Sequence, residues 1–179
     1  MGTIDSKKPK ILTCDPSFTA WGWAVIQNHS VIDFGCIKTA PEAKKRKIRE
    51  GDDRVRRISD LVNELLGVID KHNIAFMVSE LPHGSQNARA AIMVGAVGAI
   101  LQTISICENI PIEWYSENDA KKALLGRISA SKAEVIAEVQ NVFGVRIVGP
   151  KYLQEAVADS LAVYNAAHLN SPTLKILTR

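Results

Sequence analysis

Short apolar runs separated by polar turns recur near the start of the chain and again in its middle. Their lengths and their content of β-branched and aromatic residues predict β-strands. The run that ends in Glu80 is nearly uninterrupted, which is typical of a buried strand reached by a crossover helix. The predicted strands are residues 11–15, 22–27, 31–38, 74–80 and 112–115.

Helical periodicity separates the later strands. Between Val55 and Ile69, apolar residues recur at three- and four-residue steps, which predicts an amphipathic helix. Further helices are predicted over residues 88–107, 117–125, 131–143 and 154–168. The order of elements predicts an α/β fold with a mixed five-stranded sheet, three antiparallel strands followed by parallel strands, flanked by helices.

The length of 179 residues fits a single domain with a substantial core. We expect residues 1–8 and 170–179 to be flexible tails. Apolar residues (46%) and charged residues (23%) occur in the proportions of a soluble globular protein, so we expect a cytoplasmic location. The three cysteines lie in apolar runs, which predicts buried reduced thiols rather than a zinc site.

The predicted helix over residues 88–107 is rich in Ala, Gly and Ile. Its length and composition are those of a membrane span, but Arg89, Gln102 and Glu108 and the soluble pattern around it argue against one. Its small residues permit close packing on a sheet or on another helix.

Positive charge is concentrated in residues 44–57, although the net charge is only +3. Residues 40–51 show little periodicity, so we interpret them as a mobile basic loop. Two interpretations stay open: Lys45, Arg46 and their neighbours contact DNA phosphates, or the segment is a solvated flexible or localisation tract.

Acidic residues occupy similar places in several elements. Asp15 ends the first strand and Glu80 ends the fourth, while Glu155 and Asp159 lie one turn apart on the last helix. Converging carboxylates repel one another unless cations are present, and hard oxygen ligands suit Mg²⁺ or Mn²⁺. Alternatively, Asp15 caps a turn, Glu80 is a surface residue, and the two helical acids form a solvated face.

Four segments, in order along residues 9–169, resemble the RuvC family of Holliday junction resolvases, within the RNase H-like nuclease superfamily. Residues 11–22 are similar to the apolar-Asp-Pro-Gly-Ser opening of the family. Val78-Ser79-Glu80 is similar to its strand with a terminal Glu, and Asp159-Ser160-Leu161-Ala162 to its Asp-Ala-Leu-Ala helix. Residues 120–132 resemble a Val-Lys-x-x-Leu-Thr-Gly…Ala-x-Lys stretch whose lysines contact DNA.

The resemblance implies metal-dependent hydrolysis of phosphodiester bonds in four-way junctions, with 5′-phosphate and 3′-hydroxyl products. Asp15 would bridge two metal ions, Glu80 and Asp159 would each bind one, and Glu155 would complete the set. Lys132 would stabilise charge on the phosphate. Symmetric nicking needs two active sites, so we expect a homodimer, with the helix over residues 88–107 at its interface.

The residues expected to contact the branched DNA are basic or polar. They are Lys121, Lys122, Lys132, Arg89, His83, Ser85, Lys45 and Arg46.

The chain departs from the family pattern at three positions. Ser17 stands where the family usually has Gly, and Ala156 stands where it has a fourth acid or His. Glu155, one residue earlier, is the predicted substitute. His83 replaces the aromatic wedge, so it is either a stacking residue or a spectator. These changes fit a divergent, phage-type resolvase better than a housekeeping bacterial one.

Three other functions are compatible with parts of the sequence. One is an RNase H-like nuclease that acts on other branched DNA or on RNA·DNA hybrids. Another is a junction-binding protein that has lost catalysis, and Ala156 at the expected ligand position favours this second function. An actin-like ATPase also opens with apolar-Asp-x-Gly, but the chain lacks a second glycine-rich phosphate loop and is too short.

Overall fold

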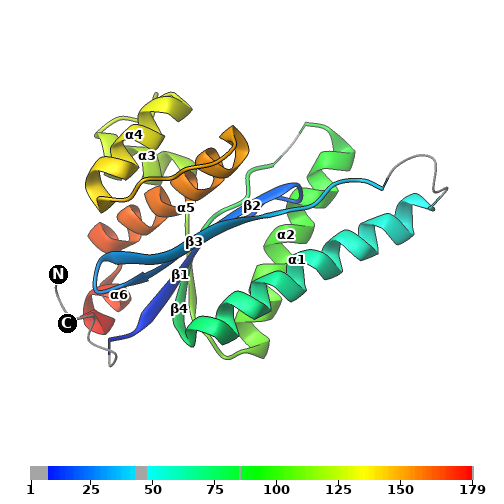
Figure 1. Ribbon diagram of the computed structural model, residues 1–179, viewed down its shortest axis with the longest axis horizontal. Coiled ribbons are helices and arrows are strands. Elements are labelled where there is room, and N and C mark those ends of the chain that lie inside the picture. The colour runs from blue at the N-terminus through cyan, green and yellow to red at the C-terminus, as the bar shows by residue number, and fades with distance from the viewer. Residues whose placement is uncertain (1–7, 43–47, 85, 179) are drawn as a thin grey trace.

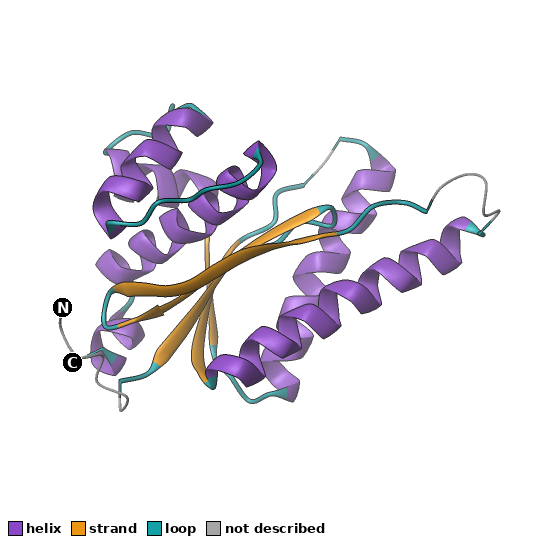
Figure 2. Cartoon of the chain, viewed as in Figure 1, coloured by secondary structure: helices purple, strands orange, loops and turns teal. Residues whose placement is uncertain are grey.

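The computed structural model describes residues 8–42, 48–84 and 86–178, and shows a twisted sheet with helices on both faces (Figure 1, Figure 2). The strands are β1 (Lys10–Asp15), β2 (Ala20–Gln27), β3 (Ser30–Lys38), β4 (Ile74–Glu80) and β5 (Ile112–Tyr115). The helices are α1 (Glu50–His72), α2 (Ala88–Cys107), α3 (Glu117–Leu125), α4 (Lys132–Phe143), α5 (Lys151–Asn170) and α6 (Pro172–Leu177).

The sheet has the order β3-β2-β1-β4-β5. β1, β2 and β3 are antiparallel neighbours, whereas β4 and then β5 join β1 in parallel. This arrangement confirms the predicted mixed five-stranded sheet. It also places the carboxyl ends of β1, β4 and β5 at one edge, where sites in parallel sheets form.

Successive side chains of each strand point to opposite faces of the sheet, so a separate hydrophobic core forms on each face. Ile11 in β1 packs with α5, whereas its neighbour Leu12 packs with α1 and α2. The same alternation separates Val78 from Met77 in β4. Figure 1 shows α5 on one face with α3 and α4 outside it, and α1 and α2 on the other face.

Several elements begin earlier than predicted. α1 starts at Glu50, inside the expected loop, because acidic residues in its first turn favour a helix N-terminus. α5 starts at Lys151, one turn before the predicted residue 154. By contrast, α4 starts at Lys132, one residue later than predicted, because Ser131 is its N-cap and its hydroxyl accepts from the Glu134 backbone N–H.

The prediction of a flexible tail over residues 170–179 is wrong for the segment that forms α6. The Ser171 side chain accepts from the backbone N–H of Leu174 and so caps this helix. Leu174 is fully buried against the α5 side of the core, which fixes the segment in place. Residues 1–7, in the other predicted tail, lie outside the described part of the chain.

One helix in the described part of the chain, α2, is long and apolar enough to cross a membrane by length and composition. Only 22% of its most apolar stretch is buried, and Ile92 and Ile106 are exposed. Cys107, at its end, is also exposed, so the prediction of three buried thiols holds for Cys14 and fails here. α2 therefore has an apolar surface that the described chain does not cover.

Candidate active site

Asp15 and Glu80 lie side by side at the ends of two neighbouring strands. β1 and β4 are parallel with Cys14 beside Ser79, so the next residue of each strand is an acid. Both acids share the face of the sheet that α5 covers, because Thr13 and Val78, two residues earlier, face this helix. The predicted convergence of these two carboxylates follows directly from the strand register.

α5 brings Asp159 over the same edge because two contacts hold this helix against the sheet. The Thr13 hydroxyl donates to the Ser160 backbone carbonyl at 2.5 Å. In β2, Gly22 lies against Ala156 so closely that a Cβ built on Gly22 would be 2.0 Å from the Ala156 carbonyl oxygen. The sheet thus has no room for a side chain where α5 crosses it, and Asp159 is fixed next to β1.

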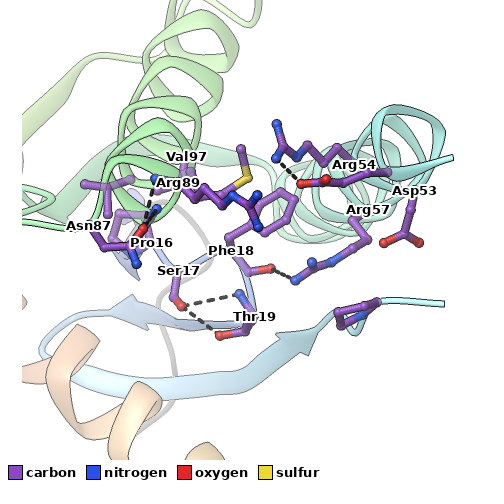
Figure 3. Close-up of a pocket in the computed structure, with 15 residues that line it drawn as sticks. Pro16, Ser17, Phe18, Thr19, Asp53, Arg54, Arg57, Asn87, Arg89 and Val97 are labelled. Atoms are coloured by element: carbon purple, nitrogen blue, oxygen red, sulfur yellow. Dashed lines mark hydrogen bonds and ion pairs between the residues drawn. The ribbon is translucent and has the colours of Figure 1, made fainter. Parts of the chain in front are cut away.

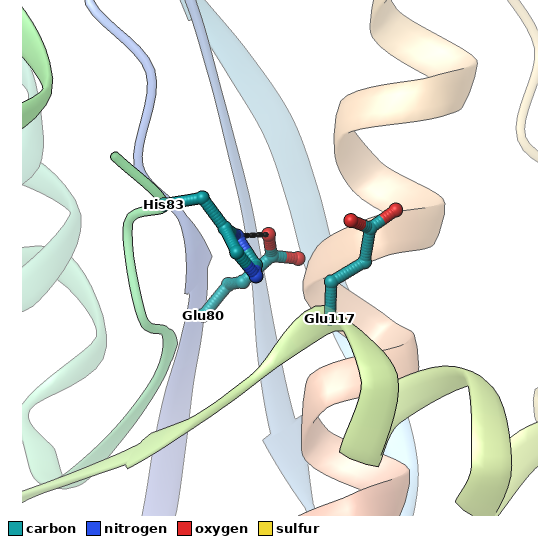
Figure 4. A group of neighbouring side chains, drawn as sticks. All are labelled: Glu80, His83 and Glu117. Carbon is teal, nitrogen blue, oxygen red and sulfur yellow. Dashed lines mark ion pairs between the residues drawn. The ribbon is translucent and has the colours of Figure 1, made fainter. Parts of the chain in front are cut away.

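A carboxylate that we did not predict as part of the site lies just after the end of a third strand, β5. β5 ends at Tyr115, which pairs with Glu80, and Glu117 then opens α3. Figure 4 shows Glu117 grouped with Glu80 and His83. The ligand atoms of these three residues all lie within 4.8 Å of one another. The signal that identified Asp15 and Glu80, an acid at the end of an apolar strand, was present here two residues after the predicted strand.

The crowded acids hold protons more tightly than usual. Burial raises the pKa of Asp15 well above its usual range, and the charges of Asp159 and Glu80 raise it further. Burial, Asp159 and Glu117 raise the pKa of Glu80 to about 7. Burial also raises the pKa of Asp159. Full ionisation of these acids would therefore leave negative charge that the residues of the site do not neutralise by themselves.

Two lysines supply part of the missing positive charge. The ammonium group of Lys132 donates to the Asp159 carboxylate, and Lys121 pairs with Glu117 at 2.6 Å. Burial alone would lower the pKa of Lys132, but Asp159 and Asp15 outweigh it, and the pKa is raised. The hydrogen bond from Lys121 is the main reason that the pKa of Glu117 is lowered.

The donor set fits a hard divalent cation. Asp15, Glu80, Glu117 and Asp159 offer carboxylate oxygens, the ligands that such ions take in proteins, and their mutual repulsion is relieved by bound positive charge. Metal binding must displace protons from these acids, so we expect it to strengthen with rising pH.

Among the described residues, the close group of ligand atoms comprises Glu80, His83 and Glu117, and it includes neither Asp15 and Asp159 nor Glu155, the predicted fourth metal ligand. Its carboxylate pairs instead with Lys151, one turn earlier on α5, at 3.6 Å. Ala156, where the family has an acid or His, is buried against Gly22.

The predicted DNA contacts are distributed over several surfaces. Lys121 and Lys132 neutralise acids of the site, and His83 is half-exposed with its Nδ1 3.7 Å from Glu80 Oε1. Lys122 lines a separate hollow with Trp114 and Asn170. Ser85, Lys45 and Arg46 lie outside the described residues.

A hollow of about 610 Å³ lies beside the turn that follows Asp15. Figure 3 shows it between the start of α2, the start of α1 and the turn after Asp15, with Arg89 on its wall. Asn87 caps α2 there, its side chain accepting from the backbone N–H groups of Arg89 and Ala90. Arg89 therefore stands at the positive end of a helix dipole, a setting that favours anions.

Much of the basic segment 44–57 is neutralised locally, which sequence reasoning did not anticipate. Arg57 is buried, with its guanidinium over the Phe18 ring and hydrogen bonds to Thr39 and to the Phe18 carbonyl. Arg57 thus holds the β1–β2 turn in place and is not free for DNA. The other arginines of this segment that the structure places in ion pairs, each with an acid of α1, are Arg49, Arg54 and Arg56.

The raised pKa of Glu80 predicts an unusual pH dependence of stability. The pKa of Glu80 is 4.5 in the unfolded chain and about 7 in the folded protein. Between these two pH values, the folded state therefore holds a proton on Glu80 that the unfolded state has lost. The free energy of unfolding, measured in EDTA, should fall as pH rises from about 5 to about 8, by about 3 kcal/mol at most from this residue. Urea unfolding of the wild type and Glu80→Gln at several pH values tests this. An identical pH slope in both proteins would refute the assignment.

The fold and the site together indicate the class of protein to which the chain belongs. A mixed sheet of this order, with carboxylates at the ends of β1 and β4 and on the helix above them, is the arrangement expected of an RNase H-like nuclease.

Within that class, the chain belongs to the RuvC family, described as crossover junction endodeoxyribonuclease RuvC, whose family model matches residues 11–166. The family protein of Protochlamydia amoebophila is 30% identical over 92% of this chain and 93% of its own length. That of Ehrlichia ruminantium is 26% identical over 83% and 91%. The structure of T. thermophilus RuvC in complex with Holliday junction substrate aligns with a TM-score of 0.71 and 20% identity, over 92% of this chain and 96% of that one.

Proposed function

We propose that this protein is a metal-dependent endonuclease that resolves four-way (Holliday) junctions by symmetric nicking. The observation that carries the proposal is the meeting of Asp15, Glu80 and Asp159 at one sheet edge, in a chain that belongs to the family over residues 11–166. Relatives from several bacteria are named crossover junction endodeoxyribonucleases, and the T. thermophilus relative is bound to junction substrate.

The residues of the site divide the work of hydrolysis. Asp15, whose carboxylate is influenced by the charges of both Glu80 and Asp159, would hold the metal ions together with these two acids. Mg²⁺, or Mn²⁺ in its place, would supply charge stabilisation for the scissile phosphate and the leaving 3′-oxygen. Lys132 pairs with Asp159 and would move its charge toward the phosphate once that carboxylate has another partner.

A homodimer accounts for the exposed apolar surface of α2. Symmetric nicking of a four-way junction needs two active sites related by a two-fold axis. α2 carries exposed Ile92 and Ile106, and small residues that would allow a second helix to approach closely. Burial of this surface against a second copy would also explain why a DNA-processing protein has a helix apolar enough to cross a membrane. We propose a cytoplasmic location for the protein.

We expect Arg89 to contact a phosphate of the junction. Arg89→Gln should weaken junction binding uniformly across sequences and reduce the slope of log affinity against log salt by about 1. Fluorescence anisotropy across a salt series measures both quantities. Lys175→Gln is the matched control, because Lys175 lies on α6, which packs near the start of β1 at the other end of the strands. An unchanged slope for Arg89→Gln would exclude this contact.

A substrate panel tests the proposed function as a whole. The panel contains a four-way junction, a flap, a linear duplex and an RNA·DNA hybrid, each in Mg²⁺ and in EDTA. We expect cleavage of the junction alone, and only with metal. Preferential cleavage of the hybrid or the flap would indicate another RNase H-like nuclease, and tight binding without cleavage would indicate a junction-binding protein.

A further inference from the structure

The active site lacks a carboxylate at the position where the family pattern places its fourth acid. Ala156 stands there, and its backbone is packed against Gly22. Glu155, the neighbouring acid, pairs with Lys151 on the surface of α5. A fourth acidic ligand can therefore be sought on an element other than α5, with Glu155 as the rival candidate.

Glu117 occupies a place equivalent to those of Asp15 and Glu80. β1, β4 and β5 are consecutive parallel strands of the sheet, and each is followed or ended by an acid at the same edge. Glu117 is the first residue of α3, directly after its N-cap Ser116. Three adjacent strand ends thus carry carboxylates at one edge of the sheet, and those of Glu80 and Glu117 lie close together.

The capping of α3 leaves Glu117 available for this role. Ser116 and Asp119 form a reciprocal capping box, in which the Asp119 carboxylate accepts from the Ser116 backbone N–H at 3.1 Å. Asp119 therefore satisfies the helix terminus, and Glu117 turns toward Glu80 and His83, with ligand atoms within 4.8 Å of theirs.

The charges around Glu117 match a cation. Four carboxylates, Asp15, Glu80, Glu117 and Asp159, lie near two ammonium groups, those of Lys121 and Lys132, so full ionisation of the four acids would leave an excess negative charge that one divalent ion would neutralise. Lys121 pairs with Glu117 just as Lys132 pairs with Asp159. Each lysine holds a carboxylate that a cation would otherwise neutralise.

We propose that Glu117 is the fourth carboxylate of the metal site, binding the same ion as Glu80, and that it takes the part that α5 fills in the family pattern. This inference rests on the proposed function only in treating the acidic cluster as a metal site, and metal binding is measurable without any nuclease activity.

The test is Mn²⁺ binding to the DNA-free protein, followed by the electron paramagnetic resonance signal of the free ion. Glu117→Gln should weaken at least one Mn²⁺ site by at least about tenfold, as expected for loss of a ligand. Glu155→Gln tests the rival ligand and should change binding less than about twofold. Glu64→Gln, at an exposed position of α1, is the matched control. Circular dichroism verifies that each variant is folded.

The outcomes separate this inference from the proposed function. Wild-type Mn²⁺ affinity in Glu117→Gln, or a loss in Glu155→Gln alone, would overturn the inference even if the protein cleaves junctions. If Glu117→Gln is misfolded, Glu117→Asp provides the second test, because it keeps the charge while withdrawing it by one methylene, and it should still weaken Mn²⁺ binding. Loss of binding in Glu117→Gln supports the inference whether or not the wild type cleaves DNA.

Discussion

Asp15→Asn is expected to slow cleavage of a four-way junction in Mg²⁺ by at least about 1000-fold, because loss of the central ligand removes several kcal/mol of charge stabilisation from the transition state. Asp15 is the residue on which Asp159, Glu80, Lys132 and Glu117 all act electrostatically. Single-turnover cleavage with excess protein measures this effect directly.

The same variant should keep its fold and its affinity for DNA. Burial and like charges already raise the pKa of Asp15, so a neutral amide removes a repulsion from the metal-free protein. Junction affinity measured in EDTA should stay within about threefold of the wild type, since phosphate contacts carry most of it. Asp70→Asn, an exposed position on α1, controls for the substitution itself. Cleavage by Asp15→Asn near the wild-type rate would show that the acidic site is wrongly assigned.

Gly22→Ala is expected to cost about 3 kcal/mol of stability and most of the activity. A Cβ at this position would be 2.0 Å from the carbonyl oxygen of Ala156 and 2.8 Å from its Cβ. Backbone atoms cannot move aside as a flexible side chain can, so α5 must shift away from β2. Asp159, three residues further along α5, would shift with the helix and leave the metal site.

Gly67→Ala is the matched control for this prediction. Gly67 is an exposed glycine within α1, and a Cβ built there meets no atom within 4 Å. The same substitution should therefore raise stability by up to about 1 kcal/mol, because alanine favours a helix. Urea unfolding and junction cleavage are measured for both variants. If Gly22→Ala is as stable and as active as Gly67→Ala, the close contact of α5 with the sheet does not position Asp159.

The fold was largely predictable because its signals are local. Strand and helix periodicities can be recognised within short stretches of consecutive residues. The order of the predicted elements then restricts the sheet to few topologies. The resemblance to the family supplied the same fold independently, and the strand order β3-β2-β1-β4-β5 confirms both. α6 was missed because its stability comes from burial of Leu174 against α5, a contact that no local pattern contains.

The site was predictable where an acid ends a strand and unpredictable where partners come from distant segments. Asp15, Glu80 and Asp159 were identified from their places in β1, β4 and α5. Glu117 was missed because it lies just past β5, at a helix start, where an acid is ordinary. Arg57 was counted with the DNA-binding charges because its contacts with Phe18 and Thr39 depend on tertiary packing.

Two copies of this acidic site are expected to cut opposite strands of one junction. The most direct measurement is the mapping of 5′-labelled products from each strand of a synthetic four-way junction, in Mg²⁺ and in EDTA. We predict paired nicks at symmetric positions on two opposing strands, with ligatable ends, and none in EDTA. Nicks on single strands at unrelated positions, equal cutting of linear duplex, or cutting that persists in EDTA would contradict the account.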